Sequence, residues 1–390
     1  MMRQAMATTF VRRLCWTLMA WALGMVASAR ALERVTASVD DAEQQLVGEV
    51  AGQSRAGDLL LRTRDGGYHR LSHEKIRSRH SDDEPFALFD ADQLEEQLLA
   101  ELPAGFRVHR STHYVVCYNT TQSYAQWTSA LLERLQKAFL AFWKNKGCSV
   151  EAPKQPLIVL VFADQQSYAQ YARRDLGAAA NSVIGYYSPE SNRILMYDLT
   201  GMQALHAADS ARGSKADVYA LLTLPEAEPL VATIVHEAAH QISFNCQLQT
   251  RLADNPLWLS EGLAVVCETP DLNSSRSWSG IGKVNYARWD RFRDNVAANR
   301  HAPLARMLAD DDLFRDGKTA VDSYAQAWAW NYFLMKWRPK PYAAYLKLLA
   351  AKPLLQDDKP AERVADFRQC FGEDLKALED DFYRRMDRVK

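Results

Sequence analysis

The amino-acid sequence predicts an α+β protein. Residues 157–162 form an uninterrupted apolar run, with the length of one strand buried on both faces. From about residue 230 onward, apolar residues recur at helical spacing almost to the end of the chain. A half that forms a sheet followed by a helical half is typical of the α+β class.

The composition excludes several classes of protein. The 390-residue chain is 48% hydrophobic and 24% charged, with a formal net charge of −1. This balance is that of a globular protein and excludes collagen-like, low-complexity and largely disordered chains. Because there is no basic excess, we expect no nucleic-acid partner.

Residues 1–29 are expected to be a signal peptide. Arginines precede an apolar run at 14–29, which closes with small residues of the A-x-A type at 27–29 and again at 29–31. The run is shorter than the roughly 20 residues that span a bilayer, so cleavage is favoured over an uncleaved anchor. The mature protein is therefore expected to be exported, without stable membrane insertion.

Five of the six cysteines follow the expected signal peptide. Five is an odd number, so at least one thiol stays unpaired in a monomer, and five are too few for a disulfide scaffold. No C-x-x-C motif occurs, which argues against a redox site and a zinc ribbon. The sequence leaves open whether any pair is bridged.

Residues 30–105 are expected to form a small β-rich module. Short apolar runs within 46–75 surround the tight-turn signal Asp65-Gly66-Gly67. The charged stretch 80–84 is expected to be mobile, and 102–106 resembles a connection to the next unit. The role of this module does not follow from the sequence.

Residues 106–390 are expected to form the second domain, whose sheet elements come first. The elements expected in order are a strand at 113–118, a helix at 122–146, a strand at 157–162, a helix at 166–174, a hairpin at 183–187 and 193–197, and a surface insertion or lid at 202–228.

The segment 231–243 contains the arrangement H-E-x-x-H on an expected amphipathic helix. His236 and His240 lie four residues apart, so one helical turn brings both imidazoles to the same side, where they can hold one metal ion. Glu237 lies beside them and is placed to hold a water molecule. This is the arrangement of zinc hydrolases, and the alternative is a pair of histidines on the rim of a buried helix.

A third metal ligand is expected at Glu261. Asn255 as N-cap and Pro256 at the first helical position predict the start of a second helix, which presents Glu261 toward the histidines. Two histidines and one glutamate leave a fourth position open for water, as a catalytic zinc site requires. The alternative for Glu261 is a solvated glutamate on a helix surface.

The run His236-Glu237-Ala238-Ala239-His240, followed by Trp-Leu-Ser-Glu-Gly-Leu-Ala at 258–264, resembles the gluzincin metallopeptidases of the thermolysin and M1-aminopeptidase clan. It is most similar to a family of bacterial exported H-E-x-x-H proteins of unassigned function. The resemblance extends from about residue 113 to the C-terminus and is most specific over 230–268. It implies a zincin-like fold with a mixed sheet, active-site helices and a helical C-terminal part.

The resemblance also implies a catalytic tyrosine. In M1-type gluzincins a tyrosine that opens a later helix stabilises the transition state. Here Tyr324, in Ser-Tyr-Ala-Gln-Ala-Trp at 323–328, lies 63 residues beyond Glu261 and matches that position. The alternative is a core aromatic residue on an amphipathic helix.

The sequence departs from the family pattern at two places. Thermolysin-like enzymes carry an aspartate four residues after the glutamate ligand, where this chain has Val265. Glu268 lies on nearly the same helical face and either supports a metal ligand or faces solvent. The region 184–187 lacks the acidic residue with which M1 aminopeptidases bind the substrate's free amine, which argues against aminopeptidase activity.

These observations predict an exported zinc metallopeptidase, periplasmic or secreted, that acts on a peptide or protein substrate. Zn2+ would be held by His236, His240 and Glu261, with Glu237 as general base and Tyr324 as oxyanion donor. Two alternatives stay open: an inactive gluzincin-fold binding or scaffold protein, and a zinc amidase acting on cell-wall material. Neither the physiological substrate nor the oligomeric state follows from the sequence.

Overall fold

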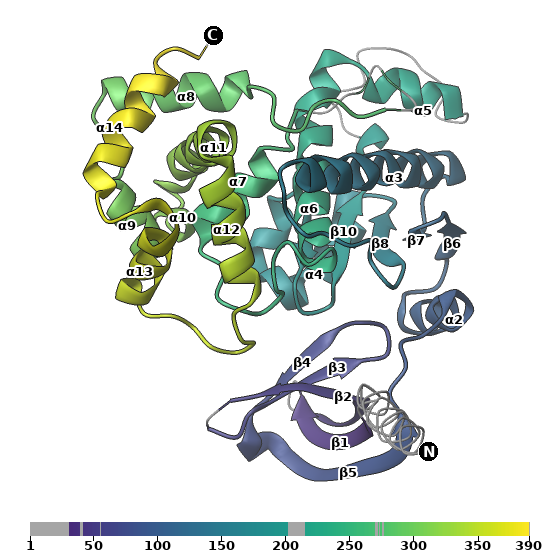
Figure 1. Cartoon of the computed structure of the whole chain (residues 1–390). Helices are drawn as coiled ribbons and strands as arrows, with labels where there is room; N and C mark the ends of the chain where they lie inside the picture. The colour runs from purple at the N-terminus through teal and green to yellow at the C-terminus, as the bar shows by residue number, and fades with distance from the viewer. Residues whose placement is uncertain are drawn as a thin grey trace, which may run out of the picture.

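The computed structural model describes residues 31–389 apart from 40, 41, 55, 202–214, 270, 271, 273, 275 and 276. It shows an α+β protein with an N-terminal β-rich module, a second, mixed sheet and many helices (Figure 1). This confirms the predicted fold class at the level of α+β. The expected signal peptide at 1–29 lies outside the described residues, as does the first half of the expected insertion at 202–228.

The N-terminal module is a five-stranded antiparallel sheet with the strand order β4-β3-β2-β1-β5. Its strands are β1 (Ala31–Val39), β2 (Ala42–Gln53), β3 (Leu59–Thr63), β4 (Tyr68–Leu71) and β5 (Ile76–Pro85). The sheet has a small core of its own, formed by Val35, Ala37, Leu59, Leu61 and Leu71. The expected turn at 65–67 joins β3 to β4, so the β-rich reading of this region is confirmed.

The expectation of a mobile stretch at 80–84 is wrong, because these residues belong to β5. This strand pairs antiparallel with β1, with Arg34 opposite His80. Arg34 also forms an ion pair with Asp82, whose partner atoms lie 2.7 Å apart. Edge strands often carry charged side chains, which discourage pairing with other molecules. The charge therefore marks the edge of a sheet and not a flexible loop.

The second sheet has the strand order β6-β7-β8-β10-β9 and is mixed. Its strands are β6 (Arg107–Arg110), β7 (Tyr114–Tyr118), β8 (Leu157–Phe162), β9 (Gly185–Ser188) and β10 (Arg193–Tyr197). β7, β8 and β10 are parallel to one another and fully buried, whereas the two edge strands are antiparallel. The continuous apolar run at 157–162 is the central strand, as predicted.

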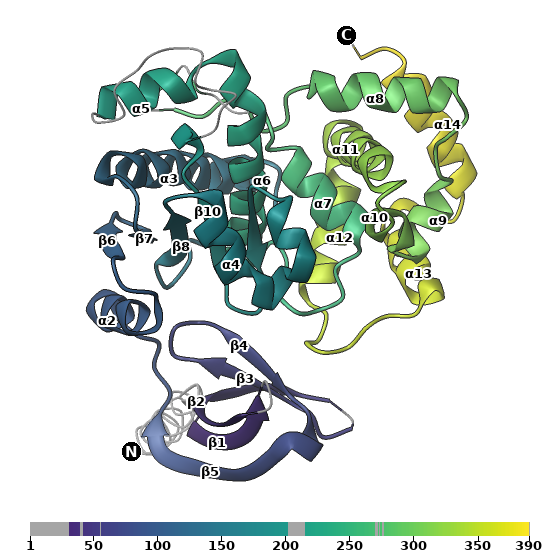
Figure 2. The same ribbon diagram turned by 180° about the vertical axis from the view of Figure 1, so that it is seen from behind.

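Helices cover both faces of this sheet. α3 (Gln122–Asn145) and α4 (Gln165–Leu176) lie on opposite sides of it in both ribbon views (Figures 1 and 2). α2 (Ala91–Glu101) packs on β7, and its buried Leu94 and Leu98 belong to the large core of this part of the molecule. One core therefore extends from α2 to the C-terminal helices.

The C-terminal half is helical, as predicted. Its helices are α5 (Lys215–Leu222), α6 (Glu228–Asn245), α7 (Leu257–Val265), α8 (Tyr286–Ala297), α9 (Leu304–Ala309), α10 (Asp312–Arg315), α11 (Ala320–Trp337), α12 (Pro339–Ala350), α13 (Pro360–Phe371) and α14 (Leu375–Met386). α7 packs on both α6 and α11, so it connects the sheet half of the molecule to the helical half (Figure 2). Most of α11 is buried.

The N-terminal module contacts the rest of the chain through the β3–β4 turn. The backbone N–H of Tyr68 donates to the carbonyl of Glu190 at 2.7 Å, in the turn between β9 and β10. Asp65 accepts a hydrogen bond from Arg193 at 2.8 Å. The side chain of Arg193 is only 6% exposed, so this ion pair is shielded from water. The module is thereby held against the edge of the second sheet.

Gly66 allows the close approach at this contact. Its φ of +86° lies in the left-handed region, and a Cβ there would lie 2.6 Å from Oε1 of Gln155. The Gly66 carbonyl accepts a hydrogen bond of 2.6 Å from Nη2 of Arg251. An L side chain at this position would be strained by the positive φ, and Gln155 would have to move aside.

The five cysteines among the described residues are free thiols. Cys117, Cys246 and Cys267 are buried, whereas Cys148 and Cys370 are partly exposed. Burial raises the pKa of all five thiols, to about 12 for Cys117 and Cys246.

No single helix in the described part of the chain is long and apolar enough to cross a membrane. One bent pair, α5 with 225–245, passes the same test of length and composition.

Candidate metal centre

α6 places the two histidines of the motif at the rim of the core. One face of the helix is buried and apolar, through Val231, Ile234, Val235, Ala238 and Ile242. The buried Nε2 of Gln241 donates to the carbonyls of Ile158 and Asn192, at 3.0 and 2.9 Å, which ties α6 to β8 and to the β9–β10 turn. The spacing of His236 and His240 then brings both rings to one side, with centroids 4.8 Å apart.

α7 supplies the third residue, although its start differs from the expectation. Pro256 has the non-helical ψ of 131° and is itself the cap, so the helix begins at Leu257. The expected cap residue, Asn255, instead donates to the carbonyls of Thr250 and Ala253. Asp311, distant in sequence, accepts the hydrogen bond of the Leu257 backbone N–H at 2.9 Å. A tertiary contact therefore replaces the local cap that the sequence predicted.

Close packing of α7 on α11 determines where Glu261 lies. A Cβ at Gly262 would overlap the amide of Asn331 and approach the carbonyl of Ala327 to 2.9 Å. The same Asn331 amide donates to the carbonyl of Trp258 at 3.0 Å. Because Gly262 has no side chain, the two helices meet at short range beside Glu261.

The described residues bring His236, His240 and Glu261 together as a group that can hold a metal ion. Nε2 of His236 lies 3.1 Å from Oε2 of Glu261 and 3.2 Å from Nε2 of His240. The third separation, from Nε2 of His240 to Oε2 of Glu261, is 3.5 Å. The side chains are 11 to 15% exposed, so the triangle of donor atoms is largely, but not completely, enclosed.

Glu237 lies next to this triangle. Its Oε2 accepts a hydrogen bond of 2.8 Å from the backbone N–H of Tyr187 on the edge strand β9. Burial raises the pKa of Glu237 above its ordinary value, and the nearby imidazoles of His236 and His240 oppose that shift. Glu237 is thus a carboxylate held in a fixed orientation, with a raised affinity for a proton.

Tyr324 reaches the same site from α11. Its ring centroid lies 6.1 Å from that of His236 and 5.8 Å from that of Phe314. Burial and the nearby carboxylates of Glu261 and Glu237 hold the pKa of Tyr324 far above its ordinary value. The hydroxyl therefore stays protonated and remains a hydrogen-bond donor at neutral pH.

Glu268 contacts the ring nitrogen of His236 that does not face Glu261. Its Oε1 lies 2.9 Å from Nδ1 of His236, and its side chain is 10% exposed. Of the two readings that the sequence left open, the structure therefore supports contact with a metal-ligand candidate. Arg288 donates from Nε and Nη2 to the two Glu268 oxygens, each at 3.0 Å, and Asn285 donates to the same carboxylate at 3.3 Å.

Residues 230–356 match a protein family described as "Protein of unknown function (DUF1570)". The matched segment contains the three donor residues together with Glu237, Glu268, Arg288 and Tyr324. A comparison with curated proteins finds no match for the chain. The matched family thus covers the whole candidate centre without assigning an activity to it.

Arg288 and Asn285 are the members of this site that sequence reasoning missed. They lie in and just before α8, distant from the H-E-x-x-H motif in sequence, and no spacing rule connects them to it. The N-cap role of Asn285, which accepts from the Arg288 backbone N–H at 3.2 Å, is the one local signal in this segment. It predicts where a helix starts but not what the helix contacts.

Proposed function

We propose that this protein is a zinc metallopeptidase of the gluzincin type, with a zincin-like fold. The triangle formed by His236, His240 and Glu261 is the observation that carries the proposal. Glu237, Glu268 and Tyr324 supply the supporting residues that such a centre needs. The proposal includes export to the periplasm or beyond, as the N-terminal sequence predicts.

The donor set fits a zinc ion. Zinc binds imidazole nitrogen and carboxylate oxygen at about 2.0–2.2 Å, and catalytic sites use three protein ligands with tetrahedral geometry. Tetrahedral ligands at about 2.1 Å from one ion lie about 3.4 Å from each other. The separations of 3.1, 3.2 and 3.5 Å between the donor atoms agree with this value. Softer thiolate ligands are not part of the group among the described residues.

A zinc ion bound here would lower the pKa of a coordinated water to about 7 and polarise the scissile carbonyl. Glu237 would accept the proton of the attacking water and later deliver it to the leaving amine. The hydrogen bond from the Tyr187 backbone N–H would hold this carboxylate in place for that transfer.

Two further residues have roles in this proposal. Tyr324 would donate its hydroxyl hydrogen bond to the oxyanion that develops in the transition state. Glu268 would orient His236 and increase its strength as a ligand, which compensates for Val265 at the position where thermolysin-like enzymes carry an aspartate. Val265 in place of an aspartate is therefore compatible with an active enzyme and does not favour the alternative of an inactive binding or scaffold protein.

The edge strand β9 suits an extended peptide substrate. It is the edge strand of the second sheet among the described residues, and the backbone N–H of its Tyr187 donates to Glu237. A peptide that adds to such an edge by backbone hydrogen bonds is placed beside the candidate base. This arrangement favours a peptide bond over other hydrolysable bonds.

Metal analysis of the purified mature protein, combined with cleavage of a peptide library, tests the proposal. We expect one zinc per chain in the wild type, none in His240→Ala, and full occupancy in the control His73→Ala, whose histidine lies on the N-terminal module. Glu237→Gln should keep the metal and lose turnover by about 10²–10⁴-fold, because an amide cannot accept the proton.

Three outcomes would contradict the proposal. Equal zinc content in the wild type and His240→Ala would reject the ligand assignment. A zinc-loaded wild type that cleaves no peptide would favour the binding or scaffold alternative. Cleavage confined to cell-wall amides would favour the amidase alternative.

A further inference from the structure

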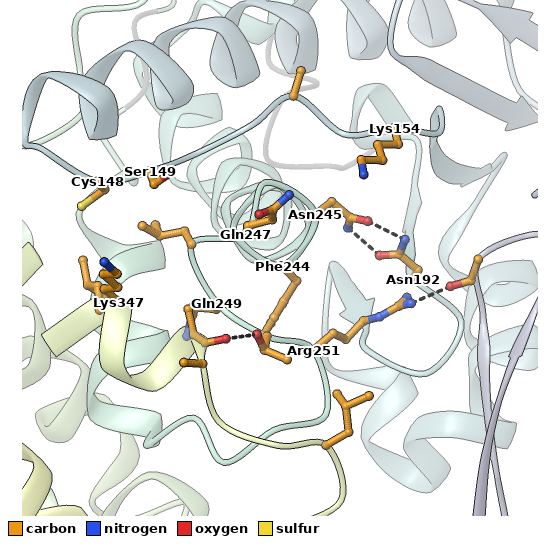
Figure 3. Close-up of a pocket in the computed structure, with 18 of the residues that line it drawn as sticks. Cys148, Ser149, Lys154, Asn192, Phe244, Asn245, Gln247, Gln249, Arg251 and Lys347 are labelled. Carbon is orange, nitrogen blue, oxygen red and sulfur yellow. Dashed lines mark hydrogen bonds between the residues drawn. The ribbon is translucent and has the colours of Figure 1, made fainter. Parts of the chain in front are cut away.

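A cavity lies between the N-terminal module and the large body of the protein (Figure 3). Its volume is about 800 Å³. The wall is formed by the β3–β4 turn, the loop after α3, the end of α6 with the loop that follows it, and α12. None of the described residues of the metal centre lines it, although Phe244 lies one helical turn beyond His240 on α6.

The wall of this cavity is positively charged. Four cationic residues line it, and no aspartate or glutamate appears among its described lining residues. Arg62 is paired with Glu49, at 3.4 Å. Lys154, Arg251 and Lys347 have no carboxylate partner within the described part of the chain. The cavity therefore carries three cationic groups that no acidic side chain neutralises.

Arg251 is the deepest of these cations. It is only 8% exposed, and its guanidinium carbon lies 4.2 Å from the centre of the Tyr68 ring. Nη2 donates to the Gly66 carbonyl and the guanidinium interacts with the Tyr187 side chain, whereas the buried Nη1 has no hydrogen-bond partner within the described part of the chain. A buried charge without a counter-charge destabilises a fold by several kcal/mol unless other groups compensate for it. Such a group at a cavity wall indicates a binding site for an anion.

The neutral polar side chains of the lining are bonded to other groups of the protein. Asn192 and Asn245 bond to each other at 2.7 and 2.9 Å at one wall, and Phe244 adds an apolar side chain beside them (Figure 3). Gln247 donates to Glu151 at 2.8 Å, and the buried amide of Gln249 bonds to Ser243 and Ser260. Small-molecule sites combine this size of cavity with a few convergent polar groups. The convergent polar groups that characterise this cavity are therefore its cationic side chains.

We propose that this cavity binds a small ligand that carries a carboxylate or phosphate group. Arg251 would neutralise the anionic group at the base of the cavity, and Lys154 and Lys347 would attract it from the exposed rim. The site is independent of the metal centre and goes beyond the proposed hydrolytic function.

Calorimetric titration of the full mature chain tests the proposal, with inorganic phosphate in one arm and succinate in the other. We expect saturable binding of at least one anion, which weakens as the ionic strength rises. The double variant Lys154→Ala, Lys347→Ala should weaken it by about tenfold or more, since two charged hydrogen-bond donors are removed. Both lysines are exposed, so the variant should fold. Arg251→Gln tests the buried cation in the same way.

The matched control is the double variant Lys318→Ala, Lys340→Ala, which removes the same charge from exposed positions outside the cavity. It should bind like the wild type, and so should His240→Ala, whose change lies in the metal centre. Loss of binding in His240→Ala alone would place the anion at the metal centre and overturn the proposal. Equal weakening in both lysine double variants, or no binding of either anion, would overturn it as well. Binding of only one anion would identify which chemical group the cavity selects.

Discussion

His236 is contacted through both ring nitrogens. Nε2 lies 3.1 Å from Glu261 and Nδ1 lies 2.9 Å from Glu268, so carboxylates determine the orientation of the imidazole from two sides. Arg288 in turn holds Glu268 with two hydrogen bonds and lies over the Tyr324 ring, 5.8 Å from its centre. The proposed ligand, its support and the proposed oxyanion donor are therefore connected at the level of single side chains.

Tyr324→Phe separates the proposed mechanism from metal binding alone. The change removes one hydroxyl and keeps the ring, so the contacts with His236 and Phe314 should remain. If the hydroxyl donates to the oxyanion, kcat should fall by about 10²–10³-fold while KM changes little. Steady-state kinetics with zinc content and Tm measured in parallel checks this. An unchanged kcat in folded, zinc-loaded protein would remove Tyr324 from the mechanism.

Glu268→Gln tests the support of His236. We expect zinc affinity to fall by about 10–100-fold, the usual effect of changing a partner that orients a metal-bound histidine. Competition with a zinc chelator measures the affinity. Glu373→Gln, at a carboxylate that is 86% exposed, is the control and should bind zinc like the wild type. Equal affinities in the two variants would show that the contact with Glu268 does not help metal binding.

The sequence predicts those features of the site that helical geometry determines. The spacing of His236 and His240 predicts a shared side of one helix, and the structure shows that arrangement. The partners of Glu268 could not be predicted, because Arg288 reaches it from another helix through tertiary packing. The identity of the metal and the reaction stay predictions.

At the level of secondary structure, the long elements were the most predictable. The central strand at 157–162 and the helix at 122–145 follow from an apolar run and a 3.6-residue period, which burial enforces. The start of α7 was misplaced because Asp311, far along the chain, caps it in place of Asn255. The charge at 80–84 predicts a mobile loop, because a polar edge strand has the same composition as a loop.

The contact between α7 and α11 gives a prediction at this scale. Gly262→Ala should lower the free energy of unfolding by about 1–3 kcal/mol, because the added methyl group would overlap the buried amide of Asn331. Urea denaturation measures the difference. Gly317→Ala is the control, since a Cβ there meets nothing within 4 Å. Equal stability of the two variants would mean that α7 and α11 do not pack as closely as described.

At the scale of the whole molecule, a buried ion pair joins the N-terminal module to the second sheet. Arg193 bonds to Asp65 of the module and to Glu101 of α2, so one guanidinium connects three parts of the chain. The contact brings the module to the turn between the edge strand β9 and β10. A module with a separate small core is thus joined to the second sheet by polar contacts.

Asp65→Asn should weaken this contact in a pH-dependent way. Burial opposes the charge on Asp65, but the Arg193 guanidinium and hydrogen bonds hold its pKa below the ordinary 3.8. The stabilisation is therefore present above about pH 4 and is lost as the pH falls through the lower pKa of the folded protein. At pH 7 the variant should be less stable by about 1–3 kcal/mol, because Glu101 remains as a partner.

Thermal unfolding of the wild type and Asp65→Asn between pH 2 and pH 7 measures this dependence. The difference between them should shrink below about pH 4. Asp357→Asn, at an exposed aspartate, should match the wild type throughout. A difference that stays constant down to pH 2 would contradict the ionic origin of the contact.

Alkylation of the buried cysteines can be used to follow local unfolding of this protein. Alkylating reagents attack the thiolate and must reach it, so a buried thiol with a raised pKa reacts only when its surroundings open. Cys117 lies in β7, Cys246 caps the end of α6 and Cys267 follows α7. The order in which these three positions acquire label during partial denaturation would reveal whether the sheet or the motif-bearing helices separate first. The native sequence needs no introduced probe for that measurement.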